Sequence, residues 1–237
     1  MTQGWLFDFG NTRLKCAPLR RGGGAGDVHA LAPDRFDDLP RGDVAYVASV
    51  APEAARVALL QALEQRFHRI AIARTSATFD GLRIAYAHPH KLGVDRFLAM
   101  VGARESWPAL IVGVGTALTL DLVDGNGLHR GGRIAPSPTL MRESLHARAA
   151  QLPPSGGAYV EFADDTEDAL ASGCEGAGIA LIERSVREVE GLLGVRPRVL
   201  VHGGGAEALL PRLAHVEHRP SLVLDGLAHW AALEQPA

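Results

Sequence analysis

The sequence predicts an α/β fold built from two similar halves. Apolar runs of strand length alternate with segments in which apolar residues recur at helical spacing. A strand, a tight glycine turn and a second strand open the chain, and the same order returns near residue 110, as it would in a duplicated two-lobe architecture. With 237 residues, the chain is long enough to give each half a core of its own.

The first half starts with a predicted hairpin. Residues 5–9 form a short apolar run that ends in Gly10 and Asn11, and residues 13–17 follow at hairpin distance, so Asp8 falls at the end of a strand. The other elements predicted for this half are a strand at 43–50, a helix at 52–67, a strand at 70–73 and a helix at 93–105.

The second half repeats this opening. An apolar strand begins at Leu110, Gly115 and Thr116 form a turn, and a second strand covers residues 118–123. The later elements are a third strand ending at residue 134, helices at 138–150 and 167–193, a strand at 198–201 and a helix at 222–233. We therefore expect an N-terminal lobe at residues 1–110 and a C-terminal lobe at residues 111–237.

Composition and charge argue against several classes of function. A net charge of −3 and a pI near 6.4 give no basic field that would attract nucleic acid or anionic lipid. The longest apolar run, residues 109–120, is too short to span a bilayer, and the N-terminus lacks the basic segment of an export signal. Two lone cysteines, Cys16 and Cys174, suit a reducing compartment, so we expect a cytoplasmic protein without nucleic-acid or membrane partners.

The first candidate site is the turn of the N-terminal hairpin, where residues 8–15 read DFGNTRLK. The glycine would let backbone amides approach a phosphate, and the polar and basic side chains would supply donors and charge. Asp8 would hold a hydrated Mg²⁺ beside that phosphate. An ordinary hairpin turn has the same pattern, because Asx-Gly turns are common, so this motif alone leaves both interpretations open.

Two later glycine segments have a similar character. Residues 113–119 read GVGTALT, a strand that runs into a glycine turn with hydroxyl groups, at the position that matches the first loop. Residues 202–206 read HGGGA, where backbone without side chains could pass close to an adenine or ribose, or could form a plain strand-to-helix loop. Neither a P-loop nor a GxGxxG after a strand is present, so the common alternative nucleotide-binding loops are absent.

Asp95 is the candidate general base. It falls in the first turn of the helix predicted at 93–105, where the helix N-terminus would stabilise the anion and where it could accept the proton of a substrate hydroxyl. Arg96 beside it could bind a substrate carboxylate through paired hydrogen bonds. An isolated aspartate at this position is otherwise a helix-capping residue, and an isolated arginine a solvated charge, so other motifs must support the catalytic interpretation.

Taken in chain order, these motifs resemble those of the type III pantothenate kinases, also described as Bvg accessory factor homologues, over nearly the whole chain. The family pattern D-x-G-N-T matches residues 8–12, G-x-D-R matches 93–96 and G-T-A-x-T matches 115–119. Residues 131–136 resemble its G-G-x-I-x-P segment, and residues 166–173 resemble its T-x-x-A-x-x-S-G segment.

The resemblance implies a fold and an activity. The fold would be the duplicated ribonuclease H-like, actin-like fold of the acetate/sugar-kinase and actin superfamily, with mixed sheets flanked by helices. The activity would be phosphorylation of pantothenate to 4′-phosphopantothenate with ATP and Mg²⁺, at the start of coenzyme A synthesis. The protein would be a homodimer in which each site is completed by the neighbouring subunit.

The resemblance also assigns the site residues. Asp95 would be the catalytic proton acceptor, and Asp8 would hold Mg²⁺ through water. The ATP site would comprise Asp8, Phe9, Gly10, Asn11, Thr12, Arg13, Leu14, Lys15 and Thr116. The pantothenate site would comprise Tyr86, Gly93, Val94, Asp95 and Arg96, with Thr166 reaching pantothenate across the dimer interface.

The chain departs from the family pattern at Gly113. Family members commonly carry an aspartate two residues before the glycine of G-T-A, where it helps to hold a monovalent cation, and this chain has glycine there. The sequence therefore leaves a requirement for potassium or ammonium open. Ser137 replaces the glycine that usually follows the G-G-x-I-x-P segment, a difference that removes no reacting group.

Two other functions remain open from the sequence. A non-catalytic nucleotide-binding regulator of the same fold would keep the architecture, but it would have no need to retain Asp8, Asp95 and Arg96 together. A different kinase or phosphatase of the same superfold would not share the substrate-side motif at residues 86–96. The motifs favour phosphoryl transfer, in which glycine loops align ATP while Asp95 deprotonates the substrate hydroxyl.

Overall fold

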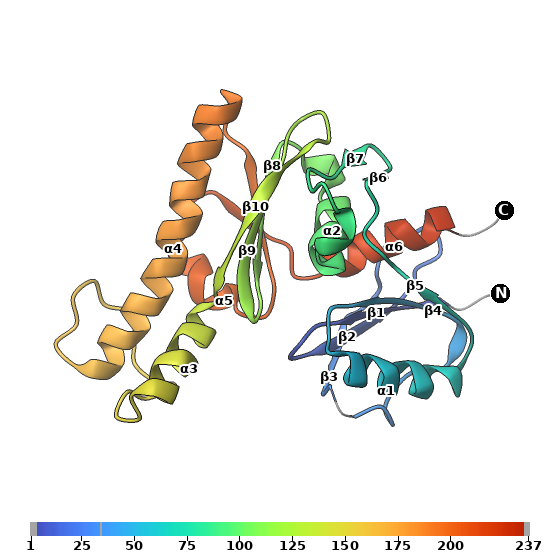
Figure 1. Cartoon of the computed structure of the whole chain (residues 1–237), viewed down its shortest axis with the longest axis horizontal. Helices are drawn as coiled ribbons and strands as arrows, with labels where there is room; N and C mark the ends of the chain where they lie inside the picture. The colour runs from blue at the N-terminus through green and yellow to red at the C-terminus, as the bar shows by residue number, and fades with distance from the viewer. Residues whose placement is uncertain (1–3, 34, 235–237) are drawn as a thin grey trace. The chain divides into compact units, whose positions relative to one another are not determined.

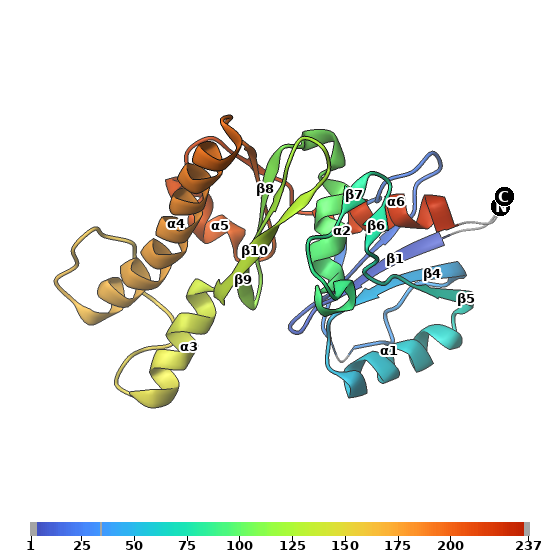
Figure 2. The same cartoon turned by 45° about the horizontal axis from the view of Figure 1, so that its top comes forward.

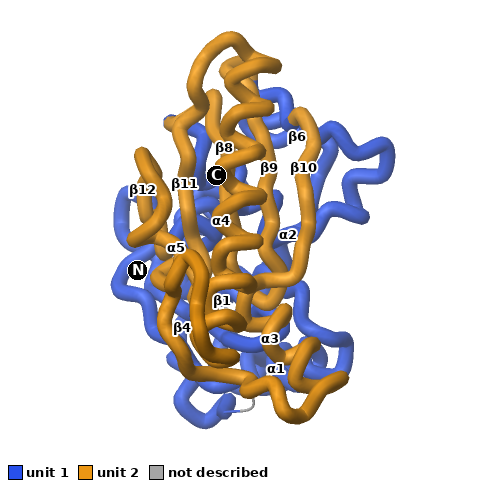
Figure 3. Tube along the Cα trace, turned by 90° about the vertical axis from the view of Figure 1, so that its left-hand side faces the viewer, with its two compact units in different colours: residues 1–105, 127–129, 221–237 blue, residues 106–126, 130–220 orange. Residues whose placement is uncertain are grey.

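A computed structural model describes residues 4–33 and 35–234 (Figure 1). The chain divides into two compact units, coloured separately in Figure 3. The first unit takes its described residues from 1–105, 127–129 and 221–237, and the second unit consists of residues 106–126 and 130–220.

The first unit contains seven strands and three α-helices among its described residues. Its elements are β1 (Gly4–Phe9), β2 (Leu14–Pro18), β3 (His29–Leu31), β4 (Gly42–Ser49), α1 (Glu53–Glu64), β5 (Phe67–Ile72), β6 (Thr78–Phe79), β7 (Leu82–Arg83), α2 (Val94–Gly102) and α6 (Leu222–Glu234). The second unit is built from β8 (Ala109–Val114), β9 (Ala117–Val123), β10 (His129–Pro136, whose first residue belongs to the first unit), α3 (Pro138–Arg148), α4 (Thr166–Leu193), β11 (Arg198–His202), α5 (Ala206–Leu209) and β12 (Val216–His218).

The main sheets of the two units have the same topology. The first sheet has the order β3-β2-β1-β4-β5, and the second has the order β10-β9-β8-β11-β12. In the first sheet, β1 pairs antiparallel with β2 and parallel with β4, and β4 pairs parallel with β5. In the second sheet, β8 pairs antiparallel with β9 and parallel with β11, and β11 pairs parallel with β12. This repetition confirms the predicted duplicated α/β fold with mixed sheets.

Helices cover both faces of the first sheet (Figures 1 and 2). Helix α1 lies on one face, where its buried Leu59 and Leu63 pack with Phe7 and Phe9 of β1. Helices α2 and α6 lie on the other face, and α6 contacts both β1 and β4. Because successive side chains of a strand point to opposite faces, Asp8 faces the side of α2 and α6.

The second sheet has its core on the side of the long helix α4. Val112 and Val114 of β8 pack in one cluster with Ile179 and Ile182 of α4. Helix α4 is capped at its N-terminus by the Asp165 carboxylate, which accepts hydrogen bonds from the Glu167 and Asp168 amides. Its C-cap is Gly194, which takes a left-handed conformation.

The C-terminal helix α6 belongs to the first unit, although it follows the last strand of the second sheet. Gly226 of α6 packs directly against the backbone of Leu98 and Gly102 in α2, at a distance that leaves no room for a side chain. Two glycines thus allow the backbones of α2 and α6 to approach closely. The sequence analysis placed residues 111–237 in one C-terminal lobe, whereas the structure assigns α6, at the end of the chain, to the first unit.

Several element boundaries differ from the sequence prediction. The helical pattern at 52–67 included Phe67, but α1 ends at Glu64 and Phe67 opens β5 instead. The reason is tertiary: the Phe67 ring packs edge-to-face on Phe7, with 5.6 Å between ring centroids. The short strands β3, β6, β7 and β12 were not predicted, because two or three residues carry no detectable periodicity.

Within residues 4–33 and 35–234, no helix combines the length and apolar character needed to cross a membrane.

Candidate active site

Asp8 lies at the end of β1, on the face of the first sheet that carries α2. It is aligned with Lys15 of the antiparallel strand β2, so the two side chains share this face. The turn that joins β1 to β2 is closed by a hydrogen bond from the Gly10 amide to the Arg13 carbonyl, 3.0 Å long. The hairpin therefore places an acid and a base together beside a tight turn.

The other residues of this hairpin separate into core and surface positions. Phe9 and Leu14 are at most 1% exposed and anchor the turn in the core, so any contact that they make with a ligand would come from their backbone. Asn11, Thr12 and Arg13 are exposed at the turn itself. This arrangement presents polar side chains and backbone outward from a rigid base.

The N-terminus of α2 lies against the same end of the sheet. The Val50 amide, just after β4, donates to the Phe9 carbonyl at 3.0 Å. A Cβ atom built on Gly93 would lie 3.7 Å from Val50 Cγ1 and only 2.6 Å from Asp95 Oδ1. Glycine at position 93 therefore leaves room for the Asp95 carboxylate over the start of α2, and a side chain there would shift that carboxylate. The carboxyl ends of parallel strands, where ligands bind in α/β sheets, thus meet the first turn of this helix.

Asp8 and Asp95 influence each other electrostatically. The pKa of the Asp8 carboxyl is raised from 3.8 to about 7, chiefly by burial and secondly by the nearby Asp95 carboxylate, while the charge of Lys15 opposes both effects. Asp95 accepts a hydrogen bond of 2.8 Å from the Arg96 amide. The structure therefore brings together two acids that are far apart in the sequence.

Arg96 connects this pair to Tyr86. The Arg96 side chain is buried, and its Nη1 donates to the Tyr86 hydroxyl at 3.3 Å while the guanidinium lies 6.0 Å from the ring centroid. Tyr86 and residues 93–96, which the sequence assigned to the substrate site, are therefore neighbours. Val94 is the first residue of α2, and its side chain is half-buried.

The sequence did not identify His129, which lies behind Tyr86. His129 is fully buried, and its ring stacks on Tyr86 with 5.9 Å between centroids and 23° between planes. The adjoining turn is held in place by a hydrogen bond from the Arg83 amide to the Gly127 carbonyl, 2.9 Å long. No local pattern could have revealed this residue, because its partner lies more than forty positions away in the chain.

In the second unit, the two later glycine segments pack against each other. The turn after β8 is closed by a hydrogen bond from the Gly115 amide to the Ala117 carbonyl, 2.9 Å long, and Thr116 is exposed at its tip. Gly203 has a positive φ of 96° and packs against the Val114 carbonyl, and the Gly205 amide donates to that carbonyl at 2.9 Å. Glycines are required here because a side chain at 203 would clash and be strained.

Thr166 lies in the second unit, at the first position of α4. Its neighbour Asp165 caps the helix, with hydrogen bonds of 2.8 and 3.0 Å from the Glu167 and Asp168 amides. The residues around Thr166 line a surface hollow with Leu152, Ala163, Asp164, Asp165, Ala169 and Leu170. Thr166 is thus positioned on a rigid helix start beside a concave surface.

The environment of Asp8 suits a hydrated divalent cation. Asp8 is an oxygen ligand, its burial disfavours an uncompensated negative charge, and a second carboxylate is near, so a hard cation would relieve the repulsion. No group of three or more His, Cys, Asp or Glu side chains that could hold a metal occurs in the part of the chain that the structure describes. Mg²⁺ commonly keeps several water ligands and binds proteins through one or two carboxylates, which is compatible with a single ligand at Asp8.

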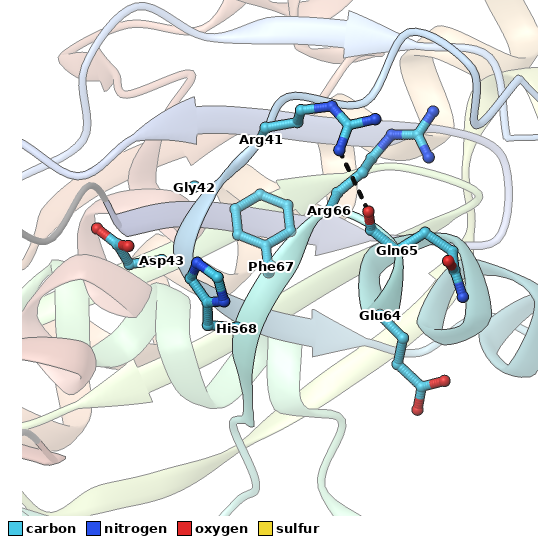
Figure 4. Close-up of a pocket in the computed structure, with 8 residues that line it drawn as sticks. All are labelled: Arg41, Gly42, Asp43, Glu64, Gln65, Arg66, Phe67 and His68. Carbon is cyan, nitrogen blue, oxygen red and sulfur yellow. Dashed lines mark hydrogen bonds between the residues drawn. The ribbon is translucent and has the colours of Figure 1, made fainter.

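Another surface hollow, which belongs to the first unit and is shown in Figure 4, lies away from Asp8 and Asp95. It is lined by Arg41, Gly42, Asp43, Glu64, Gln65, Arg66, Phe67 and His68. Gly42 begins β4, whereas Asp8 is aligned with Ala48 near the other end of that strand. The hollow therefore opens at the opposite end of the sheet and contributes nothing to the candidate site.

Comparison with known proteins identifies the family. A family model described as type III pantothenate kinase matches residues 5–188. The chain belongs to the type III pantothenate kinase family. A curated family member from Stenotrophomonas maltophilia strain R551-3 is 58% identical over 241 residues, covering 98% of each chain.

Solved structures show the same fold. A Baf family transcriptional activator from Campylobacter jejuni matches with a TM-score of 0.67 at 18% identity, covering 97% of this chain and 98% of the other. The activator of 2-hydroxyisocaproyl-CoA dehydratase from Clostridium difficile, solved with bound ADPNP, matches with a TM-score of 0.51 at 13% identity, covering 98% and 95%. At these identities the likeness concerns the fold alone, and it confirms the predicted actin-like class.

Proposed function

We propose that this protein transfers the γ-phosphoryl group of ATP to the primary hydroxyl of pantothenate, which gives 4′-phosphopantothenate and begins coenzyme A biosynthesis. The observation that carries the proposal is the pairing of Asp8 and Asp95 on one face of the first sheet, at the end where the parallel strands stop. Membership of the family supports the same activity and substrate.

Asp95 is the proton acceptor in this proposal, and its position supports that role. Asp95 lies in the first turn of α2, where the helix N-terminus and the Arg96 amide stabilise its ionised form. The hydroxyl proton of pantothenate passes to the Asp95 carboxylate as its oxygen bonds to the γ-phosphorus. The bond from that phosphorus to the bridging oxygen breaks, and ADP leaves with the electron pair.

The remaining residues hold the reactants. The hairpin turn at residues 9–15 binds the phosphate chain through its backbone amides and through Lys15. Thr116 keeps the ATP-binding role that the family resemblance implies. Asp8 would hold Mg²⁺ through water, and bound Mg²⁺ would neutralise part of the charge on the phosphates. Arg96 and Tyr86 bind and orient polar groups of pantothenate, since they form one hydrogen-bonded pair beside Asp95.

A homodimer is part of this proposal, with Thr166 contacting pantothenate in the neighbouring subunit. The segment before α4 supports it. This segment is pinned by hydrogen bonds from Arg142 Nη1 to the Gly156 carbonyl and from the Val160 amide to Ser172, at 2.6 and 2.7 Å, yet Phe162 within it is 98% exposed. An ordered segment that displays an aromatic side chain is typical of a protein interface.

The cytoplasm is the proposed location, because ATP is available there and because Cys16 and Cys174 are free thiols.

A coupled assay of the purified protein tests the proposed function. Incubation with ATP, MgCl₂ and pantothenate should yield ADP and 4′-phosphopantothenate in equal amounts, identified by mass spectrometry. Omission of pantothenate should leave little ADP formation, and chelation of Mg²⁺ should stop the reaction. A protein that binds ATP but forms no phosphorylated product would support the regulator alternative instead.

A further inference from the structure

Gly113, Thr119 and His202 lie side by side at one end of the second sheet. Gly113 of β8 is aligned with Thr119 of the antiparallel strand β9 and with His202 of the parallel strand β11. Aligned residues of neighbouring strands place their side chains on the same face. This is the face opposite to the one on which Val112 and Val114 enter the core.

The place of a side chain at position 113 is already filled. A Cβ atom built on Gly113 would lie 2.7 Å from Thr119 Oγ1, 3.1 Å from His202 Nε2 and 3.2 Å from His202 Cε1. Both neighbours would have to move to admit a carboxylate there. The ring of His202 lies against the α-carbon of Gly113, so a larger residue at position 113 would displace the imidazole.

The residues at this position do not fit a monovalent cation. Potassium and ammonium are held by oxygen atoms, with a carboxylate to balance the charge, whereas this place contains an imidazole and one threonine hydroxyl. The next carboxylate on this face of β9 is Asp121, which is aligned with Ile111 and is buried. It lies two residues, or about 7 Å, further from the turn than Thr119.

We infer that this kinase binds ATP and turns over without a bound potassium or ammonium ion, because the His202 imidazole occupies the space that a cation-holding carboxylate at position 113 would need. The inference rests on the proposed function, since it concerns the loop at Gly115 and Thr116 that is proposed to contact ATP. In this chain, Thr119 and His202 support that loop in place of an ion.

The first test compares salts. The wild-type protein is assayed with MgCl₂ and ATP supplied as Tris salts, in equal concentrations of potassium, ammonium, sodium or choline chloride. Turnover and the KM for ATP should agree among the salts within about twofold, whereas a coupled cation changes affinity about 5–150-fold. Loss of most activity in choline chloride would overturn the inference.

Calorimetry separates this inference from the proposed function. The Kd for the Mg²⁺ complex of a non-hydrolysable ATP analogue is measured in potassium and in choline chloride. Equal values support the inference even if pantothenate is not phosphorylated, in which case only the proposed function fails. Tighter binding in potassium by tenfold or more, or no binding in either salt, overturns it.

Three variants test the steric premise. Gly113→Asp should lower the Tm by about 5 °C, because the carboxylate meets Thr119 and the imidazole. Adding His202→Ala should recover part of that loss, whereas His202→Ala alone should not stabilise the protein. Additive effects of the two substitutions would show that they do not share a space and would contradict the premise.

Discussion

Asp8 and Asp95 are two acids in unequal environments, and the difference suits their separate roles. The pKa of Asp8 is raised, chiefly by burial at the end of β1, while Asp95 lies in the first turn of α2 and accepts a hydrogen bond from the Arg96 amide. A proton acceptor must be ionised at the working pH, whereas a buried carboxylate with a raised pKa is best stabilised by a cation.

Replacing Asp95 with asparagine should separate catalysis from binding. Asp95→Asn keeps the shape and an oxygen that can accept from the Arg96 amide, but it removes the proton acceptor. Turnover should fall about 10²–10⁴-fold, while the Kd for ATP stays within about threefold. Steady-state kinetics and calorimetry measure the two effects, with Asp38→Asn, at an exposed acid, as the control. Retained turnover would remove Asp95 from the mechanism.

Replacing Asp8 with asparagine should raise the stability of the protein at neutral pH relative to wild type and lower its turnover. The folded-state pKa of Asp8 lies above its ordinary value, so its protonated form favours folding. That contribution is complete below about pH 4 and is lost as the pH rises through about 7, whereas an amide does not titrate.

The Tm of Asp8→Asn, measured without nucleotide or metal, should therefore rise relative to wild type by a few degrees between pH 4.5 and pH 8. Turnover should fall, because the proposed Mg²⁺ ligand is missing. Parallel Tm profiles for the two proteins across this range would show that the pKa of Asp8 is not raised.

At the scale of elements, the position of α2 depends on its close packing with α6. Asp95, Leu98 and Gly102 all belong to α2, and the last two contact Gly226 of α6. A helix from the end of the chain thus supports the helix that carries the proposed base. Packing at this contact should affect both stability and the site.

Gly226→Ala should destabilise the protein by about 1–3 kcal/mol, because a methyl group would collide with the Leu98 carbonyl. Gly191→Ala is the matched control: it is also a helical glycine, but nothing lies within 4 Å of an added Cβ. That control should stabilise by up to about 1 kcal/mol through helix propensity. Urea denaturation measures both, and equal effects at the two positions would contradict close packing of α2 and α6.

At the scale of the whole molecule, the duplicated sheet topology gives each unit a glycine turn between its first two strands. In the first unit this turn is flanked by Asp8 and Lys15, and in the second by Gly113 and Thr119. The two copies have therefore diverged in charge while keeping their backbone plan. The acidic and basic chemistry is concentrated in the first copy.

The proposed dimer makes its own prediction. Phe162→Asp would place a charge on a nearly fully exposed aromatic residue, so it should weaken association at least about tenfold without lowering the Tm of the monomer. Size-exclusion chromatography with light scattering should show a shift to monomer on dilution, and kcat/KM for pantothenate should fall if Thr166 contacts pantothenate across the interface as proposed. Val57→Asp, at an exposed position of α1, is the control. An unchanged dimer would exclude Phe162 from the interface.

The order of the longer elements, the duplication and the motif residues were predictable from the sequence, whereas the short strands β3, β6, β7 and β12 were not. The predictable features depend on local periodicity, on turn chemistry and on the spacing of glycines, which neighbouring residues determine. Thus the hairpin at residues 5–17 and the helix that contains Asp95 were both predicted within a few residues of their observed bounds.

The tertiary structure alone decided which of these elements meet. It placed Asp95 beside Asp8, stacked His129 on Tyr86, returned α6 to the first unit and filled the space at Gly113 with His202. Each of these contacts joins residues distant in the chain. The alternation of a strand determines which side chains share a face, but only packing determines what covers that face.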